Sequence, residues 1–164
     1  MMDLAQELIK GNHRAIARAI SLAENNRSAA QDMMKKIFPG TGKSLVIGIT
    51  GPPGSGKSTL VDQMVVLLRK NGKKIGIIAV DPSSPFTGGA ILGDRIRMMR
   101  HSTDPEVFIR SMAARGHLGG LARATGEAIT ILEAAGKDFI LVETVGEARM
   151  KLRSLNWRIL FLLF

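Results

Sequence analysis

The sequence contains no cysteine and no tyrosine, and tryptophan occurs only once among its 164 residues. Without cysteine, the chain has neither a disulfide framework nor a metal site built from thiolates. The shortage of large aromatic side chains leaves few surfaces on which bases can stack, and the 23 Lys and Arg residues are scattered rather than gathered into one block. We therefore expect no nucleic-acid partner, although the formal net charge is +9.

The chain also lacks a long apolar run. The most apolar stretch, residues 156–164, is much shorter than the roughly 20 residues that cross a bilayer. Residues 1–11 do not have the basic and then apolar order of a signal peptide. We expect no membrane span and a cytoplasmic location, and the length and the 45% hydrophobic content are typical of one globular domain.

Apolar residues recur at helical spacing before residue 38. The pattern from Leu4 to Ala30 predicts helices with a break at Gly11–Asn12, and residues 29–37 predict one more short helix. The Pro and Gly residues of segment 38–42 are typical of a hinge. The sequence therefore predicts an N-terminal helical arm, residues 1–40, followed by a second domain.

From residue 44 onward, the pattern changes to strands alternating with helices. Short apolar, β-branched runs at 45–50, 74–80 and 138–142 are typical of strands buried on both faces of a sheet. Helical patterns lie between them, at about 57–70 and 121–135. This alternation predicts an α/β fold with a mostly parallel sheet and right-handed crossovers.

A phosphate-binding motif follows the first predicted strand. The pattern G-x-x-x-x-G-K-[ST] is matched by Gly51-Pro52-Pro53-Gly54-Ser55-Gly56-Lys57-Ser58. Glycines let the backbone curl so that its N–H groups face inward, and the following helix adds its positive end. In such a loop the lysine reaches the β- and γ-phosphates and the serine hydroxyl ligates Mg²⁺.

Carboxylates follow or end the other predicted strands. Asp81 ends the second strand, Asp94 lies in the loop after it, and Glu143 ends the third. Ligands of open α/β sheets bind beyond the carboxyl ends of the strands, where an acidic residue can bind Mg²⁺ or orient an attacking water. Helix capping or surface charge is the favoured explanation of any single one of them, but three on the predicted ligand side reverse this and favour a site. The Gly-, Ser- and Thr-containing residues 83–93 are interpreted as a switch loop.

Four segments resemble a known family in sequence, order and spacing. They are GITGPPGSGKSTL, AVDPSS followed by GGAILGDRIRM, GHLGGLARAT, and LEAAGKDFILVETVG. Over residues 3–146 the chain is similar to the methylmalonyl-CoA mutase-associated GTPases of the MeaB type, which also carry the name arginine/ornithine transport-system kinases.

The resemblance implies the fold, the cofactors and the partners. It implies a partial P-loop NTPase of the metallochaperone-associated GTPase class that binds GTP, with ATP as an alternative, together with Mg²⁺. Its implied function is that of a chaperone: GTP hydrolysis regulates the loading of adenosylcobalamin onto methylmalonyl-CoA mutase, or a related B12-dependent mutase, and the protection of that enzyme. Full-length members are implied to be homodimeric.

The resemblance also implies the roles of individual residues. Glu143 takes the place of the usual Asp in the D-x-x-G switch. The implied catalytic residues are Lys57, Asp81 and Glu143, and the implied metal-side residues are Ser58, Asp81 and Asp94. The implied nucleotide-binding residues run from Gly51 to Thr59.

After Gly146 the sequence departs from the family. Residues 147–164, EARMKLRSLNWRILFLLF, stand where the family has a Gln-containing switch, an N-K-x-D guanine-reading motif and a dimerisation region. A one-base shift in the reading frame of a family-like peptide, VGQDEVEIAQLADTV, can yield residues 147–161. We interpret residues 147–164 as an aberrant, frameshifted tail on an incomplete GTPase domain, residues 44–146, and a genuine variant C-terminus is the alternative.

This interpretation has physical consequences. A three-stranded sheet would leave an edge unpaired and apolar faces uncovered, so we expect poor solubility. Without a base-reading motif, we expect weak nucleotide affinity and poor discrimination between GTP and ATP. Two alternatives to a GTPase remain open at this point: an ATP-dependent kinase of an amino-acid transport system, and an inert fragment that binds nucleotide without turnover.

Overall fold

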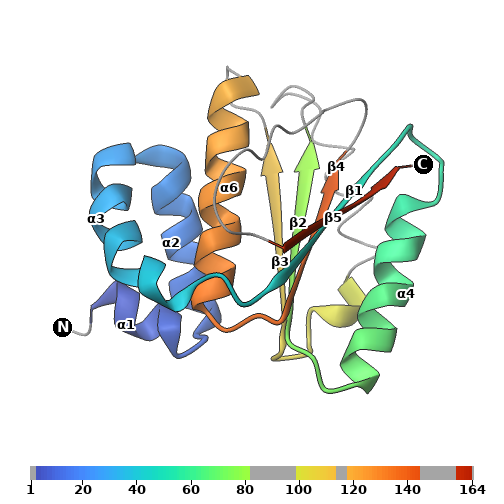
Figure 1. Ribbon diagram of the computed structural model, residues 1–164, viewed down its shortest axis with the longest axis horizontal. Coiled ribbons are helices and arrows are strands. Elements are labelled where there is room, and N and C mark those ends of the chain that lie inside the picture. Colours follow the sequence, from blue (N-terminus) through green and yellow to red (C-terminus); the bar gives the residue numbers. More distant parts are fainter. Residues whose placement is uncertain (1–2, 82–98, 114–117, 145–157, 164) are drawn as a thin grey trace.

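The computed structural model describes residues 3–81, 99–113, 118–144 and 158–163 (Figure 1). They form an α/β fold with one five-stranded sheet, helices on both of its faces and three helices at the N-terminus. Among these residues, none of the helices combines the length and the apolar character that a bilayer crossing needs.

The helices predicted before residue 38 are confirmed, as three short helices. They are α1 (Leu4–Ile9), α2 (His13–Asn25) and α3 (Arg27–Ile37), followed by the 3-10 helix η1 (Phe38–Gly40). Each α-helix begins after a side chain that accepts hydrogen bonds from the first backbone N–H groups, namely Asp3, Asn12 and Asn26. The predicted break between α1 and α2 falls at Gly11, whose φ of 80° favours glycine.

The sheet is parallel throughout, in the order β3-β2-β4-β1-β5. Its strands are β1 (Leu45–Thr50), β2 (Ile75–Asp81), β3 (Val107–Ala113), β4 (Phe139–Thr144) and β5 (Arg158–Leu163). Helix α4 (Lys57–Lys70) follows β1, the 3-10 helix η2 (Met99–His101) precedes β3, and α6 (Leu118–Ala134) precedes β4. The three strands and two helices predicted from residue 44 onward are confirmed.

The expectation of a three-stranded sheet is wrong, because β3 and β5 were not predicted. Strand β3 carries Arg110 and Ser111 between apolar residues, which interrupts the apolar run by which a buried strand is identified. Strand β5 lies in the tail, for which the sequence analysis found no convincing strand pattern. The structure pairs β5 with β1 in parallel along its whole length, from Leu45↔Arg158 to Thr50↔Leu163.

Both faces of the sheet are buried. Along β1, Val46 packs into the core shared with α6, whereas Ile47 and Ile49 pack into a second core with Val61 and Val65 of α4. Alternate residues of a strand point to opposite faces, so a continuous apolar run is what a strand between two helical layers requires. Helices α4 and α6 therefore lie on opposite sides of the sheet (Figure 1).

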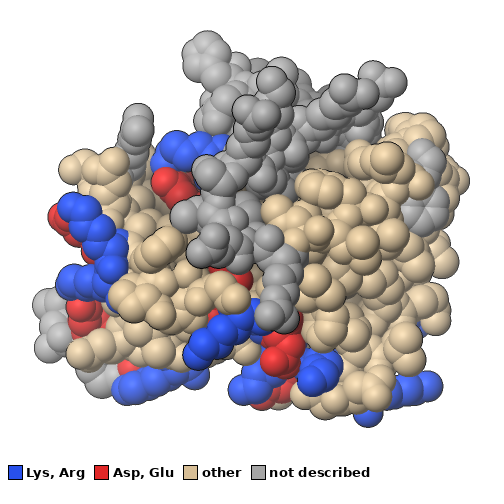
Figure 2. Space-filling view, in the orientation of Figure 1, with Lys and Arg blue, Asp and Glu red and all other residues tan. Residues whose placement is uncertain are grey.

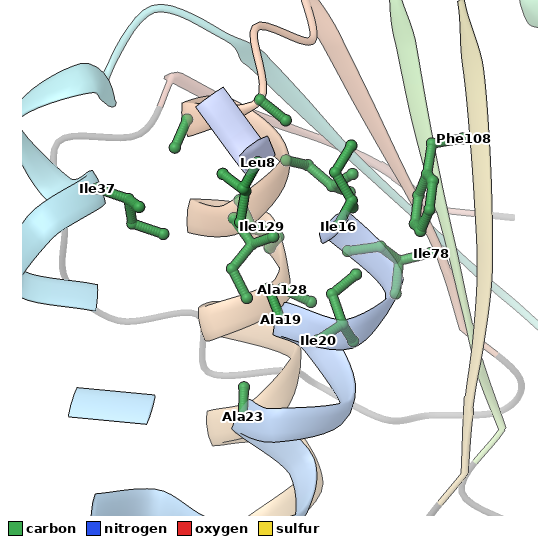
Figure 3. Close-up of a cluster of buried hydrophobic side chains, with 14 of the residues drawn as sticks. Leu8, Ile16, Ala19, Ile20, Ala23, Ile37, Ile78, Phe108, Ala128 and Ile129 are labelled. Carbon is green, nitrogen blue, oxygen red and sulfur yellow. The ribbon is translucent and has the colours of Figure 1, made fainter. Parts of the chain in front are cut away.

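The N-terminal helices share their core with α6 and the sheet. Figure 3 shows Ile16 and Ile20 of α2 beside Ile129 of α6, with Ile78 and Phe108 of the sheet alongside. All five side chains are buried. Fully burying an aliphatic or aromatic side chain contributes about 1.5–3 kcal/mol, so this contact is a large part of the fold's stabilisation.

Polar contacts reinforce the position of α2. Arg110 of β3 donates hydrogen bonds to Glu24 and, at 3.1 Å, to Ser21 Oγ. Arg123 of α6 donates to the backbone oxygen of Ala23 at 3.2 Å. On the face shown in Figure 2, Lys and Arg side chains lie beside Asp and Glu side chains in several places. The hydrogen bonds of Arg110 and Arg123 link α2 to the sheet and to α6.

One close approach between α6 and the sheet yields a test of the packing. A Cβ added to Gly76 of β2 would lie 2.8 Å from Cδ1 of Leu132, a side chain with no exposed surface. We predict that Gly76→Ala lowers the free energy of unfolding by about 1–3 kcal/mol, the usual cost of overpacking a core. Gly40→Ala is the control, because no atom lies within 4 Å of a Cβ at Gly40. Equal urea-unfolding curves for the two variants would contradict this packing.

His13, the first residue of α2, has an imidazole ring whose protonation depends on how it packs. The His13 ring packs edge-on against Phe108 of β3, with centroids 5.4 Å apart. Burial lowers the pKa of His13 from its ordinary value of 6.5, and Lys137 lowers it further, against weaker opposing contributions from the Pro105 backbone and Glu106.

This lowered pKa predicts that acid weakens the fold. Below about pH 6.5 the unfolded state protonates His13 while the folded state resists, so the unfolded state binds more protons. Stability is therefore full above that pH and is lost as the pH falls through the interval down to the folded pKa. We expect urea unfolding to show a larger loss on acidification for the native protein than for His13→Gln. Identical losses would show that His13 is not held neutral.

Candidate phosphate-binding site

The loop between β1 and α4 is shaped by two glycines. Gly54 and Gly56 have φ values of 78° and 89°, in the left-handed region that other residues rarely adopt. Gly56 is the N-cap of α4, and because it has no side chain, it cannot cap the N–H groups at the helix start. The first N–H groups of a helix have no partner within the helix. They are therefore available to an anion, which the positive end of the helix also attracts.

Lys57, the first residue of α4, is turned back toward the loop. Its side chain is buried, with 5% of the residue exposed, and its Nζ donates a 2.7 Å hydrogen bond to the backbone oxygen of Pro52. A buried ammonium needs such a partner. A phosphate oxygen is a stronger acceptor than a neutral carbonyl, so the lysine is placed to exchange one for the other.

Ser58 and Glu143 meet where the carboxyl ends of the central strands lie. Ser58 Oγ donates a 2.6 Å hydrogen bond to Oε1 of Glu143, a residue 85 positions away in the sequence. Glu143 lies near the end of β4, opposite Ile49 of β1 on one side and Ala79 of β2 on the other. The parallel register therefore brings a buried carboxylate onto the first turn of α4.

The other predicted carboxylates have different outcomes. Asp81 is the last residue of β2 and pairs with Ala113 of β3, so its backbone lies at the same edge of the sheet as Glu143. Asp94 and the predicted switch loop, residues 83–93, lie outside the described residues. The predicted nucleotide-binding residue Thr59 lies in the first turn of α4, after Ser58.

Two hydroxyl groups near the carboxyl ends of the strands are buried without a hydrogen-bond partner among the described residues: Oγ of Ser55, in the loop after β1, and Oγ1 of Thr144, at the end of β4. Buried polar atoms of this kind call for a ligand or water. The sequence analysis did not single out Thr144, although it follows Glu143 in the E-T-V-G motif. Its position at a strand end was the signal that could have identified it.

These groups fit a phosphate with a magnesium ion. Mg²⁺ prefers oxygen ligands and is usually held by one or two protein groups together with substrate phosphates and waters. The Ser58 hydroxyl and the nearby Glu143 carboxylate supply such oxygens. Among the described residues, no group of three or more His, Cys, Asp or Glu residues forms a ready-made metal cage.

The role of the Ser58 hydroxyl can be tested by a matched pair of variants. Ser58→Ala removes the hydroxyl, whereas Ser58→Thr keeps it. We predict that Ser58→Ala weakens binding of Mg²⁺-GDP about tenfold or more, because losing a contact to a charged group costs about 1.5–3 kcal/mol. Ser58→Thr should bind within a small factor of the native protein. Titration of a fluorescent GDP analogue measures both, and equal loss in both variants would contradict a metal-side role of the hydroxyl.

Comparison with known proteins finds a family whose sequence model matches most of the chain. A sequence model described as methylmalonyl Co-A mutase-associated GTPase MeaB matches residues 16–155, which extends past Gly146, where the sequence analysis placed the end of the resemblance. A Pyrococcus horikoshii protein is 59% identical over 149 residues, covering 91% of this chain and 47% of that protein.

Two further relatives carry informative names. GTPase ArgK of Escherichia coli is 41% identical over 89% of this chain and 45% of its own length. The mouse methylmalonic aciduria type A homolog, mitochondrial, is 39% identical over 85% of this chain and 37% of its own length. This chain thus spans less than half the length of the curated relatives it matches.

A solved structure shares the fold. The crystal structure of a LAO/AO transport system kinase superposes with a TM-score of 0.69 at 31% identity, covering 87% of this chain and 42% of that one.

Proposed function

The chain belongs to the MeaB family of methylmalonyl-CoA mutase-associated GTPases, and we propose that its phosphate loop binds GTP with Mg²⁺ and hydrolyses it. Members of the family are P-loop GTPases. The observation that carries the proposal for this chain is the 2.6 Å hydrogen bond between Ser58 and Glu143. It joins the expected magnesium ligand of the loop to a carboxylate at the end of β4.

Each residue has a task that its position supports. The N–H groups of the loop and of the first turn of α4 would hold the phosphate oxygens. Lys57, now bonded to the Pro52 carbonyl, would turn to the β- and γ-phosphates and stabilise the negative charge that develops there. Mg²⁺, when bound, neutralises phosphate charge, and Ser58 would hold it. Asp81 and Asp94 are proposed to lie on the metal side.

Glu143 is proposed to orient the attacking water. It lies beside Ser58 and is 4% exposed, so bulk solvent hardly competes for its carboxylate. A carboxylate in this position can accept a hydrogen bond from water and align it with the γ-phosphate. Hydrolysis is proposed for GTP first, with ATP as the alternative nucleotide.

The biological role that we propose is more specific than nucleotide hydrolysis. We propose that hydrolysis regulates the loading of adenosylcobalamin onto methylmalonyl-CoA mutase, or a related B12-dependent mutase, and protects that enzyme; homodimers are proposed for full-length members only. The family description and the name of the mouse relative support a link to methylmalonyl metabolism. A kinase acting on a transport system is not favoured; its support is the name of one solved structure.

Two variants test hydrolysis. Glu143→Gln should lower kcat by about 10²–10⁴, the range for loss of general acid–base assistance, with little change in GDP affinity. Lys57→Ala should remove hydrolysis and weaken nucleotide binding, because it deletes the charge that faces the phosphates.

Phosphate release from GTP and from ATP, without any added acceptor, is the measurement. Equal rates for the native protein and Lys57→Ala would show an inert fragment. Radiolabel transferred to a protein in place of water would instead show a kinase.

A further inference from the structure

A cluster of three polar side chains outside the phosphate loop joins α4 to the residues before β3. Asp62 of α4 accepts hydrogen bonds from both Nε and Nη2 of Arg100, the former at 2.5 Å. Nε2 of His101 lies 2.8 Å from the same carboxylate. The side chains of Asp62 and His101 are only 16% and 11% exposed, whereas that of Arg100 is 51% exposed. The carboxylate is therefore largely withdrawn from water and held by cationic or polar partners.

A second contact joins the same two segments further from the phosphate loop. Arg69, seven residues after Asp62, donates a 2.7 Å hydrogen bond to Asp104. Seven residues are close to two helical turns, so Asp62 and Arg69 lie on the same face of α4. Along the helix axis, Asp62 is about 7.5 Å from Lys57 and Arg69 is about 18 Å from it. The two contacts thus attach residues 99–104 to α4 at different distances from the loop.

Asp62 has a connection to the site that Arg69 lacks. It lies little more than a turn after Lys57 and Ser58, on the same rigid helix. Its partners Arg100 and His101 belong to η2. The cluster therefore attaches η2 to the same half of α4 that begins with Lys57 and Ser58.

We propose that Asp62 is a positioning residue of the phosphate-binding site: through Arg100 and His101, it fixes the residues before β3 against the N-terminal half of α4. The inference rests on the proposed nucleotide binding by the loop. By linkage, if nucleotide binding orders the start of α4, it also stabilises the attachment of residues 99–104, and the attachment favours nucleotide to the same degree.

The chemistry of the cluster fits positioning better than simple stabilisation. A partly buried ion pair adds little net stability, because desolvation offsets most of the attraction between the charges. Its bidentate geometry nevertheless fixes direction, since a guanidinium matches a carboxylate in one plane. Asp62→Asn keeps the size of the side chain but removes the charge and one acceptor oxygen.

The test is hydrogen exchange of the amides in residues 99–104, measured by mass spectrometry on the full chain with and without saturating Mg²⁺-GDP. The native protein should exchange more slowly at these amides when GDP is bound. In Asp62→Asn, this nucleotide-dependent slowing should fall by about fivefold or more, the lower end of usual coupling factors. Asp104→Asn is the matched control. It breaks the contact to Arg69 and should retain the slowing, even if its melting temperature drops.

Two outcomes would contradict the proposal. Full slowing in Asp62→Asn, or equal loss in both variants, shows that the contacts only hold the segments together. If Asp62→Asn does not fold, Arg100→Gln makes the same test from the more exposed partner. Lys57→Ala distinguishes a failure of the proposed function from a failure of the role of Asp62. If it responds to GDP like the native protein, the loop is not the nucleotide site and the proposed function fails. If it loses the response while Asp62→Asn keeps it, only the role of Asp62 fails.

Discussion

The parallel register of β4 between β1 and β2 is the constraint on which the site depends. It places Glu143 opposite Ile49 and Ala79, at the edge where β1 continues into the phosphate loop. A parallel sheet aligns all its carboxyl ends, so the loop, the start of α4 and the strand-end residues converge without any direct sequence link. A shift of one residue would move Glu143 to the opposite face of the sheet and away from Ser58.

The layers around the sheet serve that register. Helix α6 and the N-terminal helices bury one face and α4 buries the other, so β1, β2 and β4 are apolar on both sides. The side chains of α2 that pack on Phe108 and Ile129 make the N-terminal helices part of the same core as α6 and the sheet (Figure 3). The rigid core leaves the loop side to glycines and polar residues, where an anion can approach the backbone.

Local patterns in the sequence predicted the parts that depend on local chemistry. The glycine-rich loop before α4, the helix breaks and the three central strands follow from glycine placement and apolar runs, and the structure contains all of them. Strand β3 escaped prediction because Arg110, which bonds to Glu24 of α2, is polar within an edge strand. Strand β5 escaped because its residues were interpreted as an aberrant tail, whereas the structure places it beside β1. Contacts between distant residues, such as Ser58 with Glu143 or Asp62 with Arg100, require the register and could not be predicted from spacing alone.

The most direct test of the account is a crystal structure with Mg²⁺ and a non-hydrolysable GTP analogue. We expect the phosphates to lie among the backbone N–H groups of residues 54–58, Lys57 Nζ to move from Pro52 to a phosphate oxygen, and Ser58 Oγ to bind the metal with Glu143 nearby. An analogue bound elsewhere, with the hydrogen bonds from Lys57 to Pro52 and from Ser58 to Glu143 unchanged, would contradict it.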